Sequence, residues 1–450
     1  MLTNPMLIDP ENPFANDLLD RKTFVTKLGE ILLSGDQGIV LGLNGAWGTG
    51  KTTCVEFLQR ELINEGHVVI VLNAWADDYI SDPLVAIIAS LVEDENFKRL
   101  ISDERLIERL IAIGKNVMTL GVSLGVSRIS RGALTPEDVT SVIEVKTDYS
   151  EILDQYTAEK KELSALRSVL VEISKILEAS EDKKLIIIVD ELDRCKPTYA
   201  ISLFERIKHV LEVENLRVLL AFDQKQLEAT VEKHYGSNID ATRYLEKMFD
   251  LIVQLPSTDL HKLLKKTASS LSLPVGAPSS GFAPRSGSID ELLEMLLRLL
   301  NATQASAREL ERTLTRVKFL WARSTGLRVD PVFAVVLLIL RSQKYELFEN
   351  IKNNNSNFSE IDDFFQEFAT GSRQWIGNFQ NYIETLYYIK QDVKQDQVDL
   401  TSVAIDSQLF SELPDEIRLK RQRMQSYIES IKYESLGTLS EMALAVDFII

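Results

Sequence analysis

The sequence predicts an α/β fold, in which a parallel sheet is covered by helices and joined to a helical insertion and an all-helical C-terminal region. Three observations carry this prediction. Short, continuous apolar runs of strand length alternate with helical patterns through the first part of the chain, up to residue 258. A glycine-rich segment joins the first run to an amphipathic helix, and acidic residues follow two later runs. Uninterrupted apolar strands between helices are typical of parallel sheets that are buried on both faces.

Five apolar runs form the predicted sheet. They occupy residues 39–43, 68–72, 185–189, 217–222 and 251–255. A helix over 24–32 precedes the first strand, because its apolar residues recur at helical spacing. Asp82 and Pro83 begin another helix, which runs to about residue 92. The α/β core is therefore predicted to comprise residues 1–92 and 180–258.

Residues 93–179 form a predicted helical insertion, far longer than a strand–helix–strand crossover requires. Gly121, Gly125, Gly132 and Pro136 are expected to break its helices. Its last helix, over 150–179, carries apolar residues at spacings of three and four, namely Leu163, Leu166, Leu170, Ile173 and Leu177. This seam would suit a coiled coil with another chain. It spans only about two heptads, so packing on the chain's own sheet is favoured.

The remaining residues are predicted to form a linker with a helical lid, over 259–345, and a C-terminal helical region, over 346–450. Residues 274–288 are rich in Pro, Gly and Ser and indicate the linker. The C-terminal region carries many aromatic residues, namely Phe358, Phe364, Phe365, Phe368, Trp375, Phe379 and Tyr382. They would form either a groove for a partner or the core of a helical domain, and their helical spacing favours the core.

Composition excludes several classes of protein. The chain carries 50 Lys and Arg against 67 Asp and Glu, a net charge of −17, which disfavours broad binding to nucleic acid or anionic membranes. Cys54 and Cys195 are its two cysteines, which excludes a disulfide framework and fits a reducing cytoplasm. The apolar run 332–340 is too short to cross a bilayer, and residues 1–16 lack a secretory pattern. We expect a cytoplasmic protein without integral membrane association.

The glycine-rich segment after the first strand has the G-x-x-x-x-G-K-[ST] pattern of a phosphate-binding loop. Its glycines permit backbone conformations that turn successive N–H groups onto phosphate oxygens. Lys51 would reach the β- and γ-phosphates, and the Thr52 hydroxyl would hold Mg²⁺. The predicted nucleotide-binding residues are Gly45, Ala46, Trp47, Gly48, Thr49, Gly50, Lys51, Thr52 and Thr53.

Asp190 and Glu191 follow the apolar run 185–189. An acidic residue at the carboxyl end of a central parallel strand points into the crevice where ligands bind. Asp190 would therefore orient Mg²⁺ opposite Thr52, and Glu191 would polarise a water for attack on the γ-phosphate. Asp223 ends the next strand, and it would either sense the γ-phosphate or cap the following helix.

The remaining polar residues concern charge neutralisation, metal binding and the choice of nucleotide. Arg243, Lys247 and Arg308 are candidates to neutralise charge on the transferring phosphoryl group. The four histidines form no zinc-ligand cluster. The chain has no Asn-Lys-x-Asp segment of the kind that reads guanine, so ATP is favoured over GTP.

The chain resembles the KAP family of P-loop NTPases over about residues 15–345. The resemblance rests on a Trp inside the phosphate loop and on matching segments at 73–75, 221–223, 244–249 and 306–312. Its strongest element is Val189-Asp190-Glu191-Leu192-Asp193-Arg194-Cys195, which is similar to the family's hydrophobic-Asp-Asp-Leu-Asp-Arg signature. Asp193 and Arg194 would either couple the site to the insertion or pair with each other at a helix start.

The resemblance implies a sheet of the additional-strand, catalytic-glutamate class, in which the sensor strand lies between the phosphate-loop strand and the Asp190 strand. It implies Asp223 as sensor, Lys247 as a charge-stabilising residue given to a neighbouring subunit, and Arg308 as a lid residue. Glu191 replaces the usual Asp, which favours hydrolysis. Many members carry paired membrane helices in the insertion, and this chain lacks them. Bacterial members are often linked to exclusion of phages or plasmids.

These inferences predict a Mg²⁺-dependent ATPase that works as a conformational switch in assembly of a complex. A nucleotide-dependent scaffold with negligible turnover is the first alternative. A nucleic-acid-stimulated motor or loader is disfavoured by the charge, and a metabolite kinase by the Asp190–Glu191 pair. The expected ligands are ATP and Mg²⁺, and the expected partners are proteins bound through the helical regions and further copies of the chain.

Overall fold

The computed structural model describes residues 8–35, 37–80, 82–132, 149–180, 182–211, 213–270, 296–297, 300, 305–322, 331–353, 355 and 358–367. The chain divides into two compact units, Met1–Ser257 and Thr258–Ile450. Each unit is described by itself.

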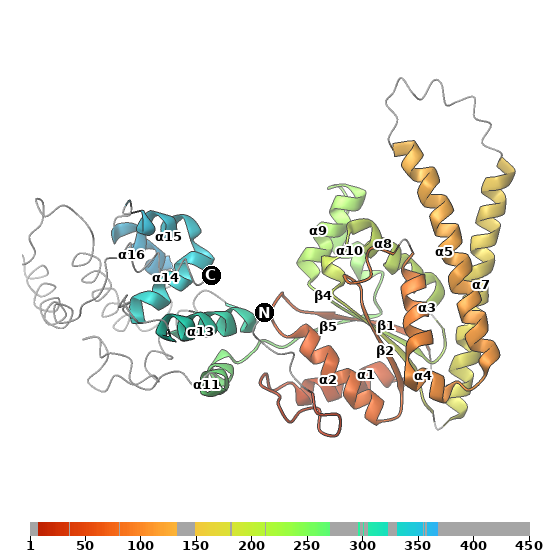
Figure 1. Ribbon diagram of the computed structural model, residues 1–450, viewed down its shortest axis with the longest axis horizontal. Coiled ribbons are helices and arrows are strands. Elements are labelled where there is room, and N and C mark those ends of the chain that lie inside the picture. The colour runs from red at the N-terminus through yellow and green to blue at the C-terminus, as the bar shows by residue number, and fades with distance from the viewer. Residues whose placement is uncertain are drawn as a thin grey trace, which may run out of the picture. The chain divides into compact units, whose positions relative to one another are not determined.

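The first unit is built on a five-stranded parallel sheet (Figure 1). Its strands are β1 (Ile39–Asn44), β2 (Val68–Asn73), β3 (Leu185–Asp190), β4 (Leu216–Phe222) and β5 (Leu251–Gln254). Their order across the sheet is β2-β3-β4-β1-β5, and every neighbouring pair is parallel. The predicted α/β class and its five strands are confirmed. Strand β4 lies between β1 and β3, as the family resemblance implied.

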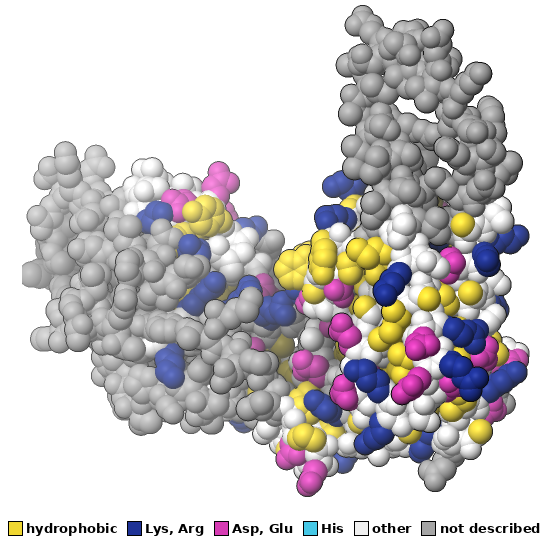
Figure 2. All heavy atoms as spheres, turned by 45° about the vertical axis from the view of Figure 1, so that its right-hand side comes forward, with side chains coloured by type: hydrophobic (Ala, Val, Ile, Leu, Met, Phe, Trp, Pro, Cys, Tyr) yellow, Lys and Arg dark blue, Asp and Glu magenta, His cyan; other side chains and the backbone are white. Residues whose placement is uncertain are grey.

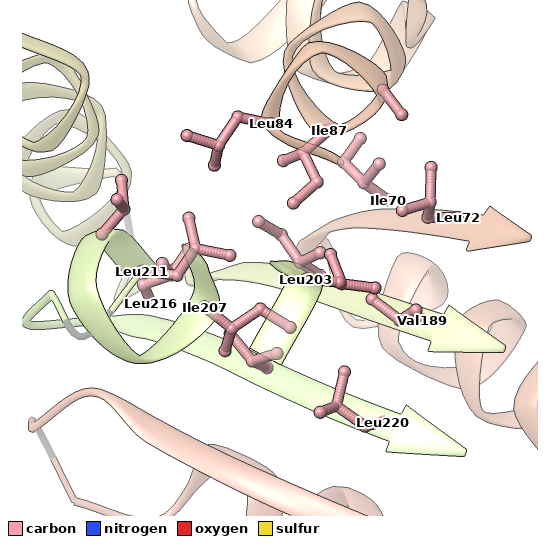
Figure 3. Close-up of a cluster of buried hydrophobic side chains, with 14 of the residues drawn as sticks. Ile70, Leu72, Leu84, Ile87, Val189, Leu203, Ile207, Leu211, Leu216 and Leu220 are labelled. Atoms are coloured by element: carbon pink, nitrogen blue, oxygen red, sulfur yellow. The ribbon is translucent and has the colours of Figure 1, made fainter. Parts of the chain in front are cut away.

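Helices cover both faces of the sheet because residues along each strand alternate between two apolar clusters. One cluster includes Leu41 and Ile188 and packs against α1 (Lys22–Leu33) and α2 (Lys51–Asn64). The other includes Ile70, Val189 and Leu220 and packs against α3 (Pro83–Glu93) and α8 (Pro197–Arg206), as Figure 3 shows. The unit also contains α4 (Glu95–Leu100), η1 (Leu192–Arg194), η2 (Ile207–Leu211), α9 (Gln224–Tyr235) and α10 (Ala241–Glu246). The central strands are therefore buried on both sides.

The insertion forms a helical hairpin of α5 (Glu104–Gly132) and α7 (Tyr149–Ala179), which extends beyond the sheet (Figure 1). The prediction that Gly121 and Gly125 break the helix is wrong, because α5 continues through both. A glycine costs only about 1 kcal/mol relative to alanine inside a helix, which neighbouring turns can offset. Along α7, the predicted seam residues Leu166, Leu170, Ile173 and Leu177 are buried in the first unit's own core.

Every strand or helix among the described residues of the second unit is a helix. It contains α11 (Leu260–Ser270), α13 (Ala307–Ala322), α14 (Pro331–Gln343), α15 (Tyr345–Lys352) and α16 (Phe358–Glu367). Phe364 is buried, as a core position requires. The predicted linker 274–288 and the aromatic residues from Phe368 onward lie outside the described residues. Across the described parts of both units, no helix combines the length and apolar character needed to cross a membrane.

Candidate active site

The phosphate loop connects β1 to α2 and has the backbone geometry that its glycines predict. Gly48 and Gly50 have φ angles of +80° and +91°, in the left-handed region that favours glycine. Gly50 also caps α2, so the loop leads directly into the positive end of that helix. The Gly45 N–H donates to the Phe222 carbonyl at 3.0 Å, which fixes the start of the loop to β4.

Lys51 is the first residue of α2 and is buried against the loop. Its Nζ donates to the carbonyl oxygens of Gly45 at 2.6 Å and Ala46 at 3.4 Å. Burial lowers the pKa of Lys51, whereas the charges of Asp193, Asp223 and Asp190 raise it and that of Arg194 lowers it. The charges of three carboxylates therefore act on the ammonium, which lies in a loop shaped to accept phosphate.

Asp190 is the last residue of β3 and is buried beside the phosphate loop. Burial raises its pKa, and hydrogen bonds from the Thr52 hydroxyl and from the Glu191 N–H, at 2.8 Å, lower it. The Thr52–Asp190 contact joins the two residues that the sequence predicted as Mg²⁺ ligands. It forms because β4 alone separates β3 from β1, so the two strand ends face one crevice.

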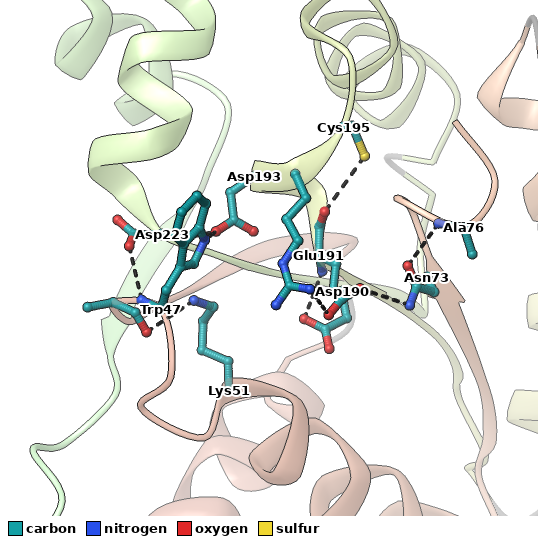
Figure 4. A network of polar contacts seen from close by, with 11 residues as sticks. Trp47, Lys51, Asn73, Ala76, Asp190, Glu191, Asp193, Cys195 and Asp223 are labelled. Atoms are coloured by element: carbon teal, nitrogen blue, oxygen red, sulfur yellow. Dashed lines mark hydrogen bonds and ion pairs between the residues drawn. The ribbon is translucent and has the colours of Figure 1, made fainter. Parts of the chain in front are cut away.

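Glu191 has φ +60° and ψ +26°, a left-handed conformation that is strained for a residue with a side chain. This turn carries the chain from β3 into η1 and directs the carboxylate toward the end of β2. Both carboxylate oxygens are engaged: Oε1 with Arg194 Nη1 at 2.8 Å, and Oε2 with Asn73 Nδ2 at 3.1 Å. Figure 4 shows this network beside Lys51 and Asp190. Glu191 is thus positioned by Asn73 at the end of β2 and by Arg194 in η1.

Asp223 both caps a helix and holds the phosphate loop. Its Oδ1 accepts from the Lys225 N–H at 3.1 Å at the start of α9, and its Oδ2 accepts from the Trp47 N–H at 3.1 Å. The Trp47 indole N–H donates to Asp193, which also accepts from the Asp223 N–H at 3.2 Å. Asp193 therefore ties the loop to β4. It does so separately from Arg194, which contacts Glu191.

Arg21 supports the loop from the N-terminal side and was not predicted as a site residue. Its Nη2 donates to the Thr49 carbonyl at 3.1 Å, and its Nη1 donates to the Pro256 carbonyl at 2.7 Å. The residue is 2% exposed, so both hydrogen bonds are shielded from water. Arg21 thereby joins the phosphate loop to the segment that leaves β5 for the second unit.

The sequence signal for several supporting residues was indirect. Asn73, Asp193 and Arg194 lie in segments that carried the family resemblance. The sequence offered Asp193 and Arg194 each other as partners, whereas Asp193 accepts hydrogen bonds from Trp47 and Asp223, and Arg194 pairs with Glu191. Lys247 is exposed at the end of α10, and Arg308 is exposed near the start of α13 in the second unit. The contacts described here do not bring either residue to the phosphate loop.

The residues of the crevice fit a magnesium–nucleotide complex. Lys51 would supply a cation for phosphate oxygens, and left-handed glycines place backbone N–H groups at a helix N-terminus. Thr52 and Asp190 would supply two oxygen ligands, the type that Mg²⁺ prefers. Among the described residues, no cluster of three His, Cys, Asp or Glu could hold a metal by itself. Mg²⁺ would therefore take its other ligands from phosphate and water.

A family model for the KAP family P-loop domain matches residues 21–320, well over half of the chain. The chain belongs to the KAP family of P-loop NTPases. Its P-loop core implies nucleotide binding.

One relative of this KAP protein is the Phage T7 exclusion protein of Escherichia coli (strain K12). The two are 26% identical over 305 residues, which cover 63% of this chain and 38% of that protein. Among solved structures, a DNA replication initiation factor is similar at 12% identity, with a TM-score of 0.34 over 96% of this chain and 100% of that one. AMPPCP-bound DnaA from Aquifex aeolicus matches at 14% identity, with a TM-score of 0.33 over 96% and 92%. These scores are too low to carry an argument about function.

Proposed function

We propose that this KAP protein is a Mg²⁺-dependent nucleoside triphosphatase, with ATP as the favoured nucleotide. The observation that carries the proposal is that Asp190, at the end of β3, lies close enough to the phosphate loop to interact with Thr52 and Lys51, next to Glu191. A hydroxyl, two carboxylates and an ammonium at the mouth of a phosphate loop are the groups that triphosphate hydrolysis needs. The preference for ATP rests on the lack of a guanine-reading segment.

In the proposed reaction, Lys51 exchanges the loop carbonyls for β- and γ-phosphate oxygens. Thr52 and Asp190 hold Mg²⁺, which supplies positive charge to the phosphate oxygens when bound. Glu191 accepts a proton from the attacking water, with its carboxylate oriented by Asn73. Asp223 keeps the loop in place through the Trp47 N–H, so the phosphates meet a preformed set of donors.

The proposed output is a conformational switch in which the helical second unit closes on the core when ATP binds. Arg21 supports this idea because a single buried side chain contacts both the phosphate loop and Pro256, next to the boundary between the units. A shift of the phosphate loop would therefore displace Arg21 and, through it, the segment at Pro256 that leads to the second unit. Arg308 is proposed to touch the nucleotide in the closed form.

The first test compares nucleotide binding and phosphate release by the wild type and by Lys51→Ala, with ATP and with GTP. Lysine contacts to phosphate are charge-assisted, so the variant should bind ATP at least about tenfold more weakly. Lys27→Ala, which removes an exposed lysine of α1, is the matched control and should bind normally. Equal ATP affinity of the wild type and Lys51→Ala would remove the proposed site.

A second candidate function is a nucleotide-dependent scaffold with negligible turnover. The engagement of both Glu191 oxygens favours it, because a carboxylate held by neighbouring side chains is less available to a water. In this case ATP would stabilise an assembly of several copies, with Lys247 offered across an interface. Turnover that rises steeply with protein concentration supports action between subunits, whereas tight binding with zero turnover supports the scaffold.

Exclusion of phage is the proposed biological setting, because a relative is named a Phage T7 exclusion protein. Protein partners are proposed for the helical regions. Nucleic acid is not favoured, because the net charge of −17 opposes broad binding to phosphates. On the face of the first unit that Figure 2 shows, acidic and basic side chains are interspersed. Plating of phage T7 on Escherichia coli that expresses the wild type or Lys51→Ala tests this setting. Equal plating on both strains would argue against a nucleotide-dependent role in exclusion.

A further inference from the structure

Arg194 lies between the proposed catalytic carboxylate and an exposed aromatic ring. Its Nη1 is 2.8 Å from Glu191 Oε1, and its guanidinium carbon is 5.7 Å from the centre of the Trp75 ring. Its side chain is 29% exposed, and Trp75 is 53% exposed. Contacts of both kinds are weak where water has access, so the guanidinium can be drawn away by a stronger partner.

A nucleotide in the proposed site would be that stronger partner. Arg194 pairs with Glu191, and Glu191 lies beside Asp190 and Lys51 at the crevice where the phosphates would bind (Figure 4). A terminal phosphate carries more negative charge than one carboxylate and offers several oxygens to a planar guanidinium. The γ-phosphate would therefore compete with Glu191 for Arg194. ADP lacks that phosphate and would leave the Arg194–Glu191 pair in place.

We propose that Arg194 is a positioning residue that responds to the γ-phosphate. It holds the Glu191 carboxylate in the arrangement described here, and it turns onto the γ-phosphate when Mg-ATP binds. Glu191 then keeps the contact between its Oε2 and Asn73, and its Oε1, released by Arg194, can accept a proton from water. This inference rests on the proposed function, because it requires Mg-ATP in the crevice.

The competition predicts an effect on affinity that needs no measurement of turnover. Calorimetry would give the affinity for Mg-ADP and for a non-hydrolysable Mg-ATP analogue. Arg194→Ala should weaken binding of the analogue about tenfold or more, the usual loss for a charge-assisted hydrogen bond, and change ADP affinity less than about twofold. Lys196→Ala is the matched control, because Lys196 belongs to the same segment but pairs with Asp78. It should leave both affinities unchanged.

A double-mutant cycle separates competition from a merely structural ion pair. Glu191→Ala removes the competitor, so it should tighten binding of the analogue more in the presence of Arg194 than in the Arg194→Ala background. A structural pair predicts equal effects in the two backgrounds. Arg194→Lys serves if Arg194→Ala does not fold, because lysine keeps the charge but loses the planar contact, and analogue affinity should fall between those of the wild type and Lys51→Ala.

The outcomes are distinct. An unchanged ratio of analogue to ADP affinity in Arg194→Ala, with ADP binding intact, overturns this inference and leaves the proposed function standing. Equal effects of Glu191→Ala in the two backgrounds also overturn it. A wild-type chain that binds neither nucleotide overturns the proposed function and this inference together.

Discussion

Substitution of Gly50 by alanine tests the geometry of the phosphate loop, because two separate costs apply at this position. The residue has φ +91°, and a Cβ built on it would lie 2.5 Å from Leu19 Cδ1. Gly35 provides a matched comparison. It has φ +69°, also left-handed, and nothing lies within 4 Å of its built Cβ. The difference between Gly50→Ala and Gly35→Ala therefore isolates the contact with Leu19.

The magnitudes follow from these two terms. A left-handed alanine costs about 1–2 kcal/mol, partly offset by about 0.4–1 kcal/mol from the lower entropy of the unfolded chain. Gly35→Ala should therefore lower the free energy of unfolding by about 1 kcal/mol. Overpacking adds about 1–3 kcal/mol, and the lower end applies to Gly50 because a half-buried Leu19 methyl can shift. We expect Gly50→Ala to cost about 2 kcal/mol.

Urea unfolding and Mg-ATP binding provide the assay. Gly50→Ala should be less stable than Gly35→Ala. It should also bind Mg-ATP at least about tenfold more weakly than the wild type, because the loop N–H groups would no longer point at the phosphate oxygens. Leu19→Ala in the Gly50→Ala background should remove the extra cost of crowding without restoring affinity. The reasoning is refuted if Gly50→Ala and Gly35→Ala are equally stable and both bind Mg-ATP as the wild type does.

Two further predictions concern residues outside the loop. Arg21→Ala should lower the free energy of unfolding by about 3 kcal/mol, because two buried hydrogen bonds from a charged donor are lost, whereas Lys27→Ala should change it by less than about 0.5 kcal/mol. Equal stability of these two variants would contradict the supporting role of Arg21. Burial lowers the pKa of His67, with Lys183 and Lys184 acting in the same direction. The unfolded chain then takes up the proton first, so stability should fall as pH drops below about 6.5, and fall less in His67→Gln. Parallel urea-unfolding curves for the wild type and His67→Gln between pH 7.5 and 5.5 would count against this effect.

The strands and the phosphate loop could be predicted from the sequence because their signals are local. A continuous apolar run such as 185–189 predicts a buried strand, and the glycine–lysine–threonine pattern predicts a loop before a helix. The order of the strands was implied by the family resemblance, since spacing along the chain does not determine which strands pair. Gly121 and Gly125 do not end α5, because the surrounding turns outweigh the cost of about 1 kcal/mol of a glycine inside a helix.

The supporting contacts of the site could not be predicted because they join distant residues. Arg21 and Pro256 are separated by 235 positions, and Asn73 and Glu191 by 118. The sequence predicts a helix from residue 24 and strands that end at residues 72, 189 and 255, all close to these residues, but it gives no distance between them. For Asp223 the sequence predicts either a γ-phosphate sensor or a helix cap and cannot choose between them. In the structure one carboxylate both caps α9 and accepts the Trp47 N–H of the phosphate loop.

Phosphate release by Glu191→Gln in a single turnover tests whether β1 and β3 build one Mg-ATP site in which Glu191 accepts the proton of the attacking water. Glu191→Gln should bind Mg-ATP at least as tightly as the wild type and release phosphate at least about a hundredfold more slowly, the usual contribution of a general base. Phosphate release at the wild-type rate by Glu191→Gln would contradict the account.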